Sequence, residues 1–353
     1  MNSEKITQAL HEVEESDKAL AAAFERRLDA IKVIAEYRRE HGIPVPAEPD
    51  GGERAQELSA VITDAEKRPY YMSFFQGALS ASEKYHRRIM QGVRVAYTGV
   101  KGAFANIAAS RIFPDGEMVS YPDFAASYTA VERGECDCAV LPIENSYAGE
   151  VGQVIELMFS GTLYIGGVYS LRVKHNLLGL RGATPSGVKK VVSHPQALHQ
   201  CAPYIQAHGY ECIQETNTAV AAQRVAEGGD PTVAAIASAE TAKLYGLEVL
   251  DHDINESGDN TTRFAVFSRT PNIDEDHRDR SRFLLMFILQ NVPGALASAI
   301  NVISSYGFNM KVIRSRPIKE PAWEYYFYVE AEGDEESENG RRMISELRQH
   351  CRV

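Results

Sequence analysis

The sequence is poor in cysteine and tryptophan. It has five cysteines and one tryptophan in 353 residues. So few cysteines argue against a disulfide framework, and reduced core thiols are the simplest interpretation. Cys136 and Cys138 lie in a strand-like pattern that points both sulfurs to one face, and no second Cys/His pair stands at ligand spacing from them. We therefore expect no metal site there.

Positive charge and long apolar runs are also scarce. The 37 Lys and Arg residues face 48 Asp and Glu, a net charge of −11, and they form no long basic block. This excludes an extended nucleic-acid surface, although a small anion needs only a local cluster of donors. No apolar run could span a bilayer, and the polar start "MNSEKITQALHEVEE" is no signal peptide. We expect a cytoplasmic protein with neither a membrane nor a nucleic-acid partner.

The chain is longer than one ordinary core, and its patterns predict three domains: residues 1–90, 91–270 and 281–353. The first is predicted to be an all-α domain of three helices. Its long helix, Ile6 to Arg38, has apolar residues at alternating steps of four and three, which predicts a buried seam.

Three charged residues, Asp17, Arg27 and Arg38, fall on this seam, where an unpaired charge is costly. An internal Asp–Arg pair or a fraying helix end would explain them, and so would an anion site inside a helical bundle. The domain buries little by itself, so we expect dimerisation through the long helix.

Residues 91–270 contain the order strand, helix, strand, helix, strand twice, and the two copies end in the similar segments "AVLPIENSYAG" and "AAIASAETAKLYG". This repeat predicts a two-lobed α/β domain of the periplasmic-binding-protein-like kind, with parallel strands. Ligands of such sheets bind outside the carboxyl ends of the strands.

Polar residues gather at those predicted strand ends. They are Lys101 and Gly102 after the first strand, then Glu144, Asn145, Ser146, Ser193, His194, Gln196, Asn217 and Thr218. Helix N-termini bind carboxylates through free N–H groups, but helix capping alone explains Ser193, Asn217 or Thr218 about as well as ligand contact does. Only the convergence of several on one cleft favours a binding site.

The stretch "GDNTTRFAVFSR" places Thr261, Thr262 and Arg263 directly before an apolar strand. Threonine suits a strand end, and Arg263 could pair with Asp259 or Glu256. The alternative is a site for an anionic ligand.

Residues 281–353 follow the charged linker "RTPNIDEDHRDRS" and have the pattern strand, helix, strand, strand, helix. This order predicts an α+β ferredoxin-like sandwich that lacks its last strand. Sandwiches with "NVPGAL" before the first helix bind effectors or partners more often than they catalyse.

The motifs "GVKGAFANIAA", "VLPIENSYAGEV", "SHPQALHQC", "NTAVAA" and "NTTRFAVF" resemble, in order and spacing, the prephenate dehydratase family. "VPGALASAINVISSYGFNMKVIRSRP" resembles the ACT domain that normally follows, and residues 1–88 are similar to the chorismate mutase domain fused in front in bifunctional members. The resemblance implies conversion of prephenate to phenylpyruvate, CO₂ and water in L-phenylalanine biosynthesis. It implies no cofactor.

The resemblance also implies roles for residues. Thr262 is the hydroxyl beside the leaving group, Arg263 a partner for a substrate carboxylate, and Phe264 a wall of the pocket. Asn145 and Gln196 add donors from the facing lobe. The other residues expected around the substrate are Glu144, Ser146, Ser193, His194, Asn217, Thr218, Lys101 and Gly102. His194 titrates in the range of a general acid, but at a helix start it also suits a structural cap.

The first motif departs from the family's glycine-proline-x-glycine-threonine-phenylalanine-serine. Val100, Ala103 and Ala105 replace the proline and both hydroxyls. We expect this loop to contribute backbone N–H groups and Lys101 rather than side-chain hydrogen bonds.

For the mutase, the resemblance implies a site of cations and donors: Arg27, Arg38, Arg54, Ser82 and His86. Arg38 replaces a lysine, and His86 replaces a glutamine. Leu10 stands where the family donates an arginine across a dimer, and a lost charge-assisted contact weakens binding or rate. We expect weak mutase activity on chorismate, or activity that depends on other residues.

In the ACT domain, the resemblance implies a phenylalanine effector site that includes Gly294, Ala295, Leu296, Ser315 and Arg316. Arg314 replaces the family's glutamate. An ACT pair that serves only as an interface of a homodimer or homotetramer is the alternative. For the whole chain, arogenate dehydratase and a non-catalytic ligand-binding sensor remain open.

Overall fold

The structure is a computed structural model that describes residues 3–44, 51–256, 258–270, 281–317 and 325–352; the side chains of residues 3, 4, 51–54 and 317 are not described. Most of the linker "RTPNIDEDHRDRS" and of the loop "AEPDGG" therefore lies outside the described residues. The chain forms two compact units: residues 1–141 with 171–260, and residues 142–170 with 261–353.

The three helices predicted for the N-terminal region are present: α1 (Ser3–Glu40), α2 (Gly51–Ser59) and α3 (Arg68–Gln91), with a short 3₁₀ turn at Ala65–Lys67. They belong to the first unit together with part of the α/β segment. Asp64 caps this turn by accepting from Glu66 N. The C-terminal half of α1 packs on α3, with Ala35 fully buried.

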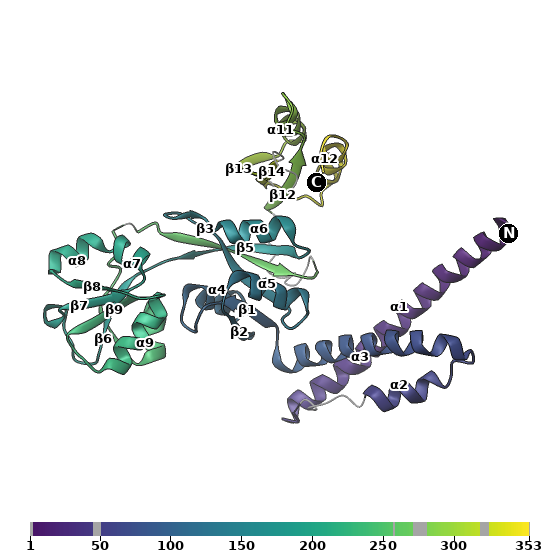
Figure 1. The fold of residues 1–353 in the computed structure, drawn as a ribbon, viewed down its shortest axis with the longest axis horizontal. Coiled ribbons are helices and arrows are strands. Elements are labelled where there is room, and N and C mark those ends of the chain that lie inside the picture. The colour runs from purple at the N-terminus through teal and green to yellow at the C-terminus, as the bar shows by residue number, and fades with distance from the viewer. Residues whose placement is uncertain (1–2, 45–50, 257, 271–280, 318–324, 353) are drawn as a thin grey trace. The chain divides into compact units, whose positions relative to one another are not determined.

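The prediction of a buried seam is wrong for the N-terminal half of α1 in this chain, and the seam residue Ile34 in the packed half is 48% exposed as well. Ile6, Leu10 and Val13 are 45%, 65% and 59% exposed. The reason is length, because α1 has 38 residues and α3 has 24. The first turns of α1 therefore extend away from the other two helices (Figure 1). Asp17 is exposed as well, so its charge carries no burial cost.

The first sheet of this unit has the order β2-β1-β3, all parallel. Its strands are β1 (Arg94–Thr98), β2 (Glu117–Tyr121) and β3 (Cys138–Asn145), joined by α4 (Phe104–Ile112) and α5 (Phe124–Glu132). β3 enters the second unit at Pro142.

The second sheet of the unit has the order β10-β6-β9-β7-β8. Its elements are β6 (Asn176–Gly179), a 3₁₀ turn (Pro185–Gly187), β7 (Lys190–Ser193), α7 (Pro195–Gln200), α8 (Ala202–His208), β8 (Glu211–Gln214), α9 (Thr218–Gly228), β9 (Val233–Ala237), α10 (Ala239–Tyr245) and β10 (Glu248–Asp251). The parallel order β8-β7-β9 repeats β2-β1-β3, which confirms the predicted repeat. The prediction of parallel strands is incomplete, because β6 and β10 join this sheet antiparallel.

The second unit begins with the end of β3, to which β4 (Gly149–Glu150) pairs antiparallel. It continues with α6 (Gly152–Ser160), β5 (Tyr164–Arg172), whose last two residues belong to the first unit, and β11 (Thr261–Ser268). The order is β3-β11-β5.

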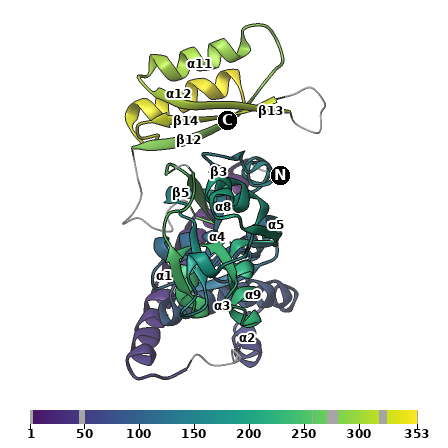
Figure 2. The ribbon, with the colours of Figure 1, turned by 90° about the vertical axis from the view of Figure 1, so that its left-hand side faces the viewer.

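The C-terminal segment, residues 281–352, has the predicted order β12 (Arg282–Leu289), α11 (Ala295–Ser305), β13 (Asn309–Pro317), β14 (Tyr325–Glu332), α12 (Glu338–His350). Its antiparallel sheet has the order β12-β14-β13. Both helices lie on one face of it (Figure 2), over a core that includes Phe287, Ile303 and Met343. A single antiparallel bridge between Ile288 and Arg352 stands where a last strand would pair.

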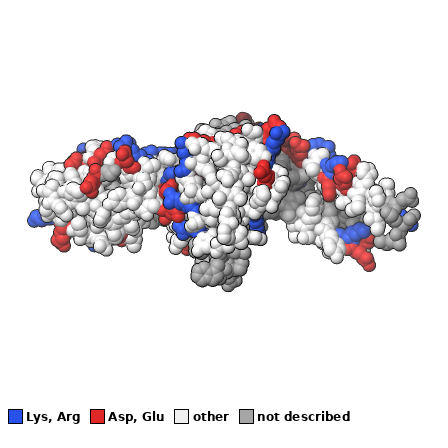
Figure 3. All heavy atoms as spheres, turned by 90° about the horizontal axis from the view of Figure 1, so that it is seen from above, with Lys and Arg blue, Asp and Glu red and all other residues white. Residues whose placement is uncertain are grey.

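Within the part of the chain that the structure describes, no helix has both the length and the apolar character needed to cross a membrane. On the face shown in Figure 3, acidic and basic residues are interspersed. That face carries no continuous basic surface.

Candidate functional site

Two of the predicted residues, Asn145 and Thr262, hydrogen-bond to each other in the second unit. Asn145 Nδ2 donates to Thr262 Oγ1 at 2.8 Å and to the Thr261 carbonyl at 3.4 Å. Asn145 Oδ1 accepts from the backbone N–H groups two and three residues further on, at 3.0 and 2.9 Å. Those two bonds fix which way the amide points. Thr262 Oγ1 is therefore the acceptor, and its own proton is not used in this bond.

Ser146 holds the same two segments together. Its backbone N–H donates to the Thr261 carbonyl at 2.8 Å, and its Oγ accepts from Thr261 N at 3.0 Å. The "IENS" and "NTTR" motifs are thus joined at the start of β11 through main chain and side chain. Phe264, two residues after Thr262, lies on the same face of the strand and is 2% exposed.

Arg263 and Glu144 lie on the opposite face, because successive side chains of a strand alternate. Arg263 Nη1 pairs with Glu144 at 3.3 Å, and Nη2 pairs with Glu330 of β14 at 2.7 Å. Burial lowers the pKa of the guanidinium, but the hydrogen bond and charge of Glu330 outweigh burial and raise it. Arg263 is therefore charged and already held by two carboxylates.

The β1–α4 loop in the first unit carries Lys101 and Gly102. Gly102 has φ +88°, and a Cβ there would stand 3.0 Å from Leu244. Its N–H donates to Asn106 Oδ1 at 3.0 Å, and its carbonyl accepts from Thr241 Oγ1 at 2.9 Å. The Gly102 peptide groups are thus used to fix the loop.

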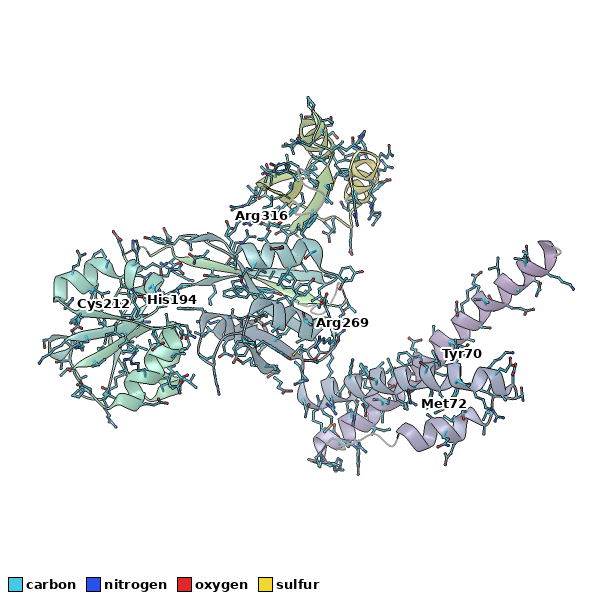
Figure 4. The ribbon with its side chains drawn as sticks, viewed as in Figure 1. Tyr70, Met72, His194, Cys212, Arg269 and Arg316 are labelled. Atoms are coloured by element: carbon cyan, nitrogen blue, oxygen red, sulfur yellow. The ribbon has the colours of Figure 1, made fainter. Side chains whose placement is uncertain are left out.

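The predicted residues near α7 and α9 make structural hydrogen bonds. Buried Ser193 donates to the Ile236 carbonyl at 2.6 Å. His194 Nδ1 accepts from Gln196 N at 3.2 Å and so caps α7 (Figure 4). Burial lowers the pKa of His194, which favours the neutral ring that this cap requires. Asn217 caps α9, and Thr218, the first residue of α9, is buried.

Sequence reasoning missed a buried polar cluster in the first unit, formed by His175, Gln200 and Asn260. Gln200 Oε1 accepts from Asn260 Nδ2 at 3.0 Å and lies 2.9 Å from His175 Nε2. Gln200 Nε2 and His175 Nδ1 are buried with no hydrogen-bond partner among the described residues. Burial lowers the pKa of His175, so the ring is neutral. The sequence signal that could have revealed this cluster is that His175 and Gln200 are polar residues within the largely apolar stretches "HNLL" and "QALHQC".

A cavity of about 220 Å³ lies in the same unit beside Phe104, whose ring meets His175 edge-on. Its lining includes two ion pairs, Arg111–Glu240 and Lys174–Asp253. A third cation, Arg172, also lines the cavity and donates from Nε to the Gly258 carbonyl at 2.7 Å. The lining therefore holds three cationic side chains and two carboxylates.

Four of the five predicted mutase residues are neighbours in the helical region. Arg27 Nε donates to the buried Ser82 Oγ at 2.9 Å. Burial, followed by the charges of Arg38 and Arg87, lowers the pKa of His86. The Arg54 side chain lies outside the described residues.

The predicted effector residues of the C-terminal segment lie in two places, at the start of α11 and near the end of β13. Gly294, with φ +88°, precedes α11, while Ala295 and Leu296 begin the helix and pack against the core. On β13, Ser315 is exposed and Arg316 pairs with Glu150 at 2.6 Å (Figure 4).

Comparisons with known proteins agree on one family. A family model described as "Prephenate dehydratase" matches residues 95–272. "Arogenate dehydratase/prephenate dehydratase 2, chloroplastic" of Arabidopsis thaliana is 35% identical over 316 residues, which is 86% of this chain and 81% of that protein. "Bifunctional chorismate mutase/prephenate dehydratase" of Aquifex aeolicus is 28% identical, over 98% of this chain and 95% of its own length.

Among solved structures, the prephenate dehydratase of Arthrobacter aurescens in complex with L-Phe has a TM-score of 0.65 and 26% identity, and the match covers 73% of this chain and 86% of that one. The family model alone spans half of the sequence, and the relatives extend the likeness beyond it. The chain belongs to the prephenate dehydratase family.

Proposed function

We propose that this chain is a prephenate dehydratase, which converts prephenate to phenylpyruvate, CO₂ and water. The observation that carries the proposal is the Asn145–Thr262 hydrogen bond, in which the amide donates and the threonine proton remains available. A donor of this kind is what a departing ring hydroxyl needs.

The reaction breaks the ring C–O bond and the C–C bond to the ring carboxylate. The electrons of the C–C bond complete the aromatic ring, CO₂ departs, and the hydroxyl takes up one proton to leave as water. A threonine hydroxyl is a weak acid, so Thr262 orients and hydrogen-bonds the leaving oxygen rather than supplying a free proton. The Asn145 bond polarises the Thr262 O–H and so strengthens it as a donor.

Within the first unit, Gln200 is a separate candidate donor to a ligand, because its amide nitrogen is buried without a partner among the described residues. A buried unsatisfied donor is costly, and a ligand oxygen would satisfy it. The predicted substrate residues, Gln196 among them, stay part of the proposal.

Arogenate is the second candidate substrate, and the arogenate dehydratase name of the plant relative favours it. It differs from prephenate by an amino group in the side chain, away from the leaving hydroxyl. The same Asn145–Thr262 pair would serve both.

The two flanking activities are also proposals. The Arg27–Ser82 hydrogen bond and the nearby Arg38 and His86 support a weak chorismate mutase site, in which exposed Leu10 supplies no anion partner. The L-Phe complex of the bacterial relative supports regulation by phenylalanine through an ACT-type C-terminal segment. The exposed apolar residues of α1 support a homodimer or homotetramer.

An NMR time course of the purified chain tests these proposals in one tube. Chorismate is added first, then prephenate, and arogenate is added to a parallel sample. Consumption of prephenate with appearance of phenylpyruvate is expected, and chorismate conversion above its background rate would establish the mutase. Prephenate that decays no faster with the protein than without it would refute the dehydratase proposal.

A further inference from the structure

Seven side chains of the second unit form one continuous ion-pair network of alternating charge. Its pairs, in order, are Arg282–Glu330 (3.3 Å), Glu330–Arg263 (2.7 Å), Arg263–Glu144 (3.3 Å), Glu144–Arg314, Arg314–Glu150 (2.9 Å) and Glu150–Arg316 (2.6 Å). Arg263 and Glu144 belong to the predicted dehydratase motifs, whereas Glu330 and three of the arginines belong to the C-terminal segment. The network therefore joins that segment to the motif strands.

Arg314 has a specific electrostatic task in this network. Glu144 and Glu150 are directly opposite each other on β3 and β4, and like charges in such a cross-strand pair repel. The Arg314 guanidinium contacts both carboxylates and compensates their charge. A glutamate here, as the family resemblance leads one to expect, would add a third acid to the pair.

Glu330 anchors the other end of the network. Its side chain is 3% exposed, and its two oxygens pair with Arg263 and Arg282. A buried carboxylate without partners is costly, and the two arginines compensate this one. Arg263 is thus fixed by a buried group of β14.

Packing supports the same contact. The Arg316 guanidinium lies against Gly152 at the start of α6, where a Cβ would stand 3.0 Å from Nη1. The Phe159 ring of α6 stacks on Tyr326 of β14, with centroids 3.9 Å apart. Charge and packing therefore hold the C-terminal sheet to the motif strands.

We infer that Glu330 and Arg314 are positioning residues of the dehydratase site, acting through Arg263 and Glu144. Arg263 directly follows Thr262 in the chain, and Glu144 directly precedes Asn145. A shift of either residue therefore changes the Asn145–Thr262 pair. The C-terminal segment thereby sets the geometry of that pair. The inference rests on the proposed function.

The test compares Arg314→Met and Glu330→Gln with Lys311→Met in the full-length chain. Lys311 is the matched control, because it lies on the same strand and makes an exposed pair with Glu332, outside the network. For each variant, kcat and KM for prephenate are measured with and without L-phenylalanine. A fall in kcat of about tenfold or more, with a smaller change in KM, is expected for the two network variants, since small misplacements of reacting groups are costly. Arg314→Lys, which keeps the charge, should restore part of the rate.

Unchanged kcat and unchanged phenylalanine response in both network variants, or equal effects of Lys311→Met, would overturn the inference. A second measurement separates it from the proposed function. Thermal unfolding of Arg314→Met, Glu144→Gln and the double variant forms a cycle that needs no activity. If the losses of unfolding free energy of the two single variants add up in the double variant, Arg314 and Glu144 are not coupled, and the inference is refuted even if the enzyme is active. If the wild-type protein does not consume prephenate, only the proposed function is refuted.

Discussion

Replacing Thr262 with valine is the sharpest test of the site, because it removes one hydroxyl and keeps the branched shape. The change deletes the 2.8 Å hydrogen bond from Asn145 Nδ2 and leaves that nitrogen its longer, 3.4 Å contact with the Thr261 carbonyl. Thr262 is half-buried, so the loss of folding free energy should fall near about 1 kcal/mol, the usual net value of one hydrogen bond.

The catalytic loss should be larger. A pre-positioned donor that acts on a developing charge contributes roughly 100- to 1,000-fold to kcat, or about 2.7–4 kcal/mol. A variant that merely weakened the fold would shift the melting temperature by a few degrees and leave the rate of the folded fraction intact. Rate loss and stability loss are therefore separable.

The assay measures phenylpyruvate formation at saturating prephenate, together with thermal unfolding of the same sample. Thr261→Val is the matched control, since the hydrogen bonds described for Thr261 use its backbone N–H and carbonyl. We expect the control to keep nearly full kcat. A Thr262→Val enzyme that turns over prephenate within twofold of wild type would refute the role of this hydroxyl.

Three further predictions follow from the described contacts. Gln200→Met removes the buried amide donors at similar volume, and kcat/KM for prephenate should fall by about tenfold or more. Gln206→Met, at an exposed side chain of α8, should change little. Burial and the charges of Arg38 and Arg87 lower the pKa of His86 in the folded state, so protonation of this ring costs stability. The loss begins as the pH falls below the unfolded pKa of about 6.5 and is complete once the pH has fallen through the lower folded pKa. His86→Gln should flatten the melting-temperature profile across that range, and an unchanged profile would contradict this. Leu10→Glu on the exposed apolar stripe of α1 should lower the solution mass measured by light scattering, while His11→Glu beside the stripe should not.

Much of the fold could be predicted because its signals are local. "CAVLPIEN" is β3 residue for residue, and "EMVSY" is β2, since apolar residues between turn residues mark strands. The repeated order of elements likewise predicted the shared strand order of the two parallel sheets. Local patterns carry less information about partners. That β6 and β10 pair antiparallel depends on which edge of the sheet is open, which no local pattern encodes. In the same way, the periodicity of α1 does not show that α3 is too short to cover the whole length of α1.

The residues of the site could be predicted where a local motif marks them, but their partners in space could not. The motifs located Asn145 and Thr262, which are separated by 117 positions and yet hydrogen-bonded. The partners of Arg263 were not predictable, because Asp259 and Glu256 are near in sequence whereas Glu144 and Glu330 are near only in the fold. Gln200 escaped notice because an unpartnered donor is defined by its surroundings and not by its residue type.

The period of two along a β-strand gives the "IENS" and "TTRF" motifs two separate tasks. Asn145 and Thr262 point to one face and form the pair that meets the leaving hydroxyl in the proposed reaction. Glu144 and Arg263 point to the other face and are held by Arg314 and Glu330 of the C-terminal segment. Adjacent residues of one motif can therefore have different tasks, one chemical and one mechanical. Loss of Arg263 should accordingly disturb the coupling to the C-terminal segment as much as it disturbs the chemistry.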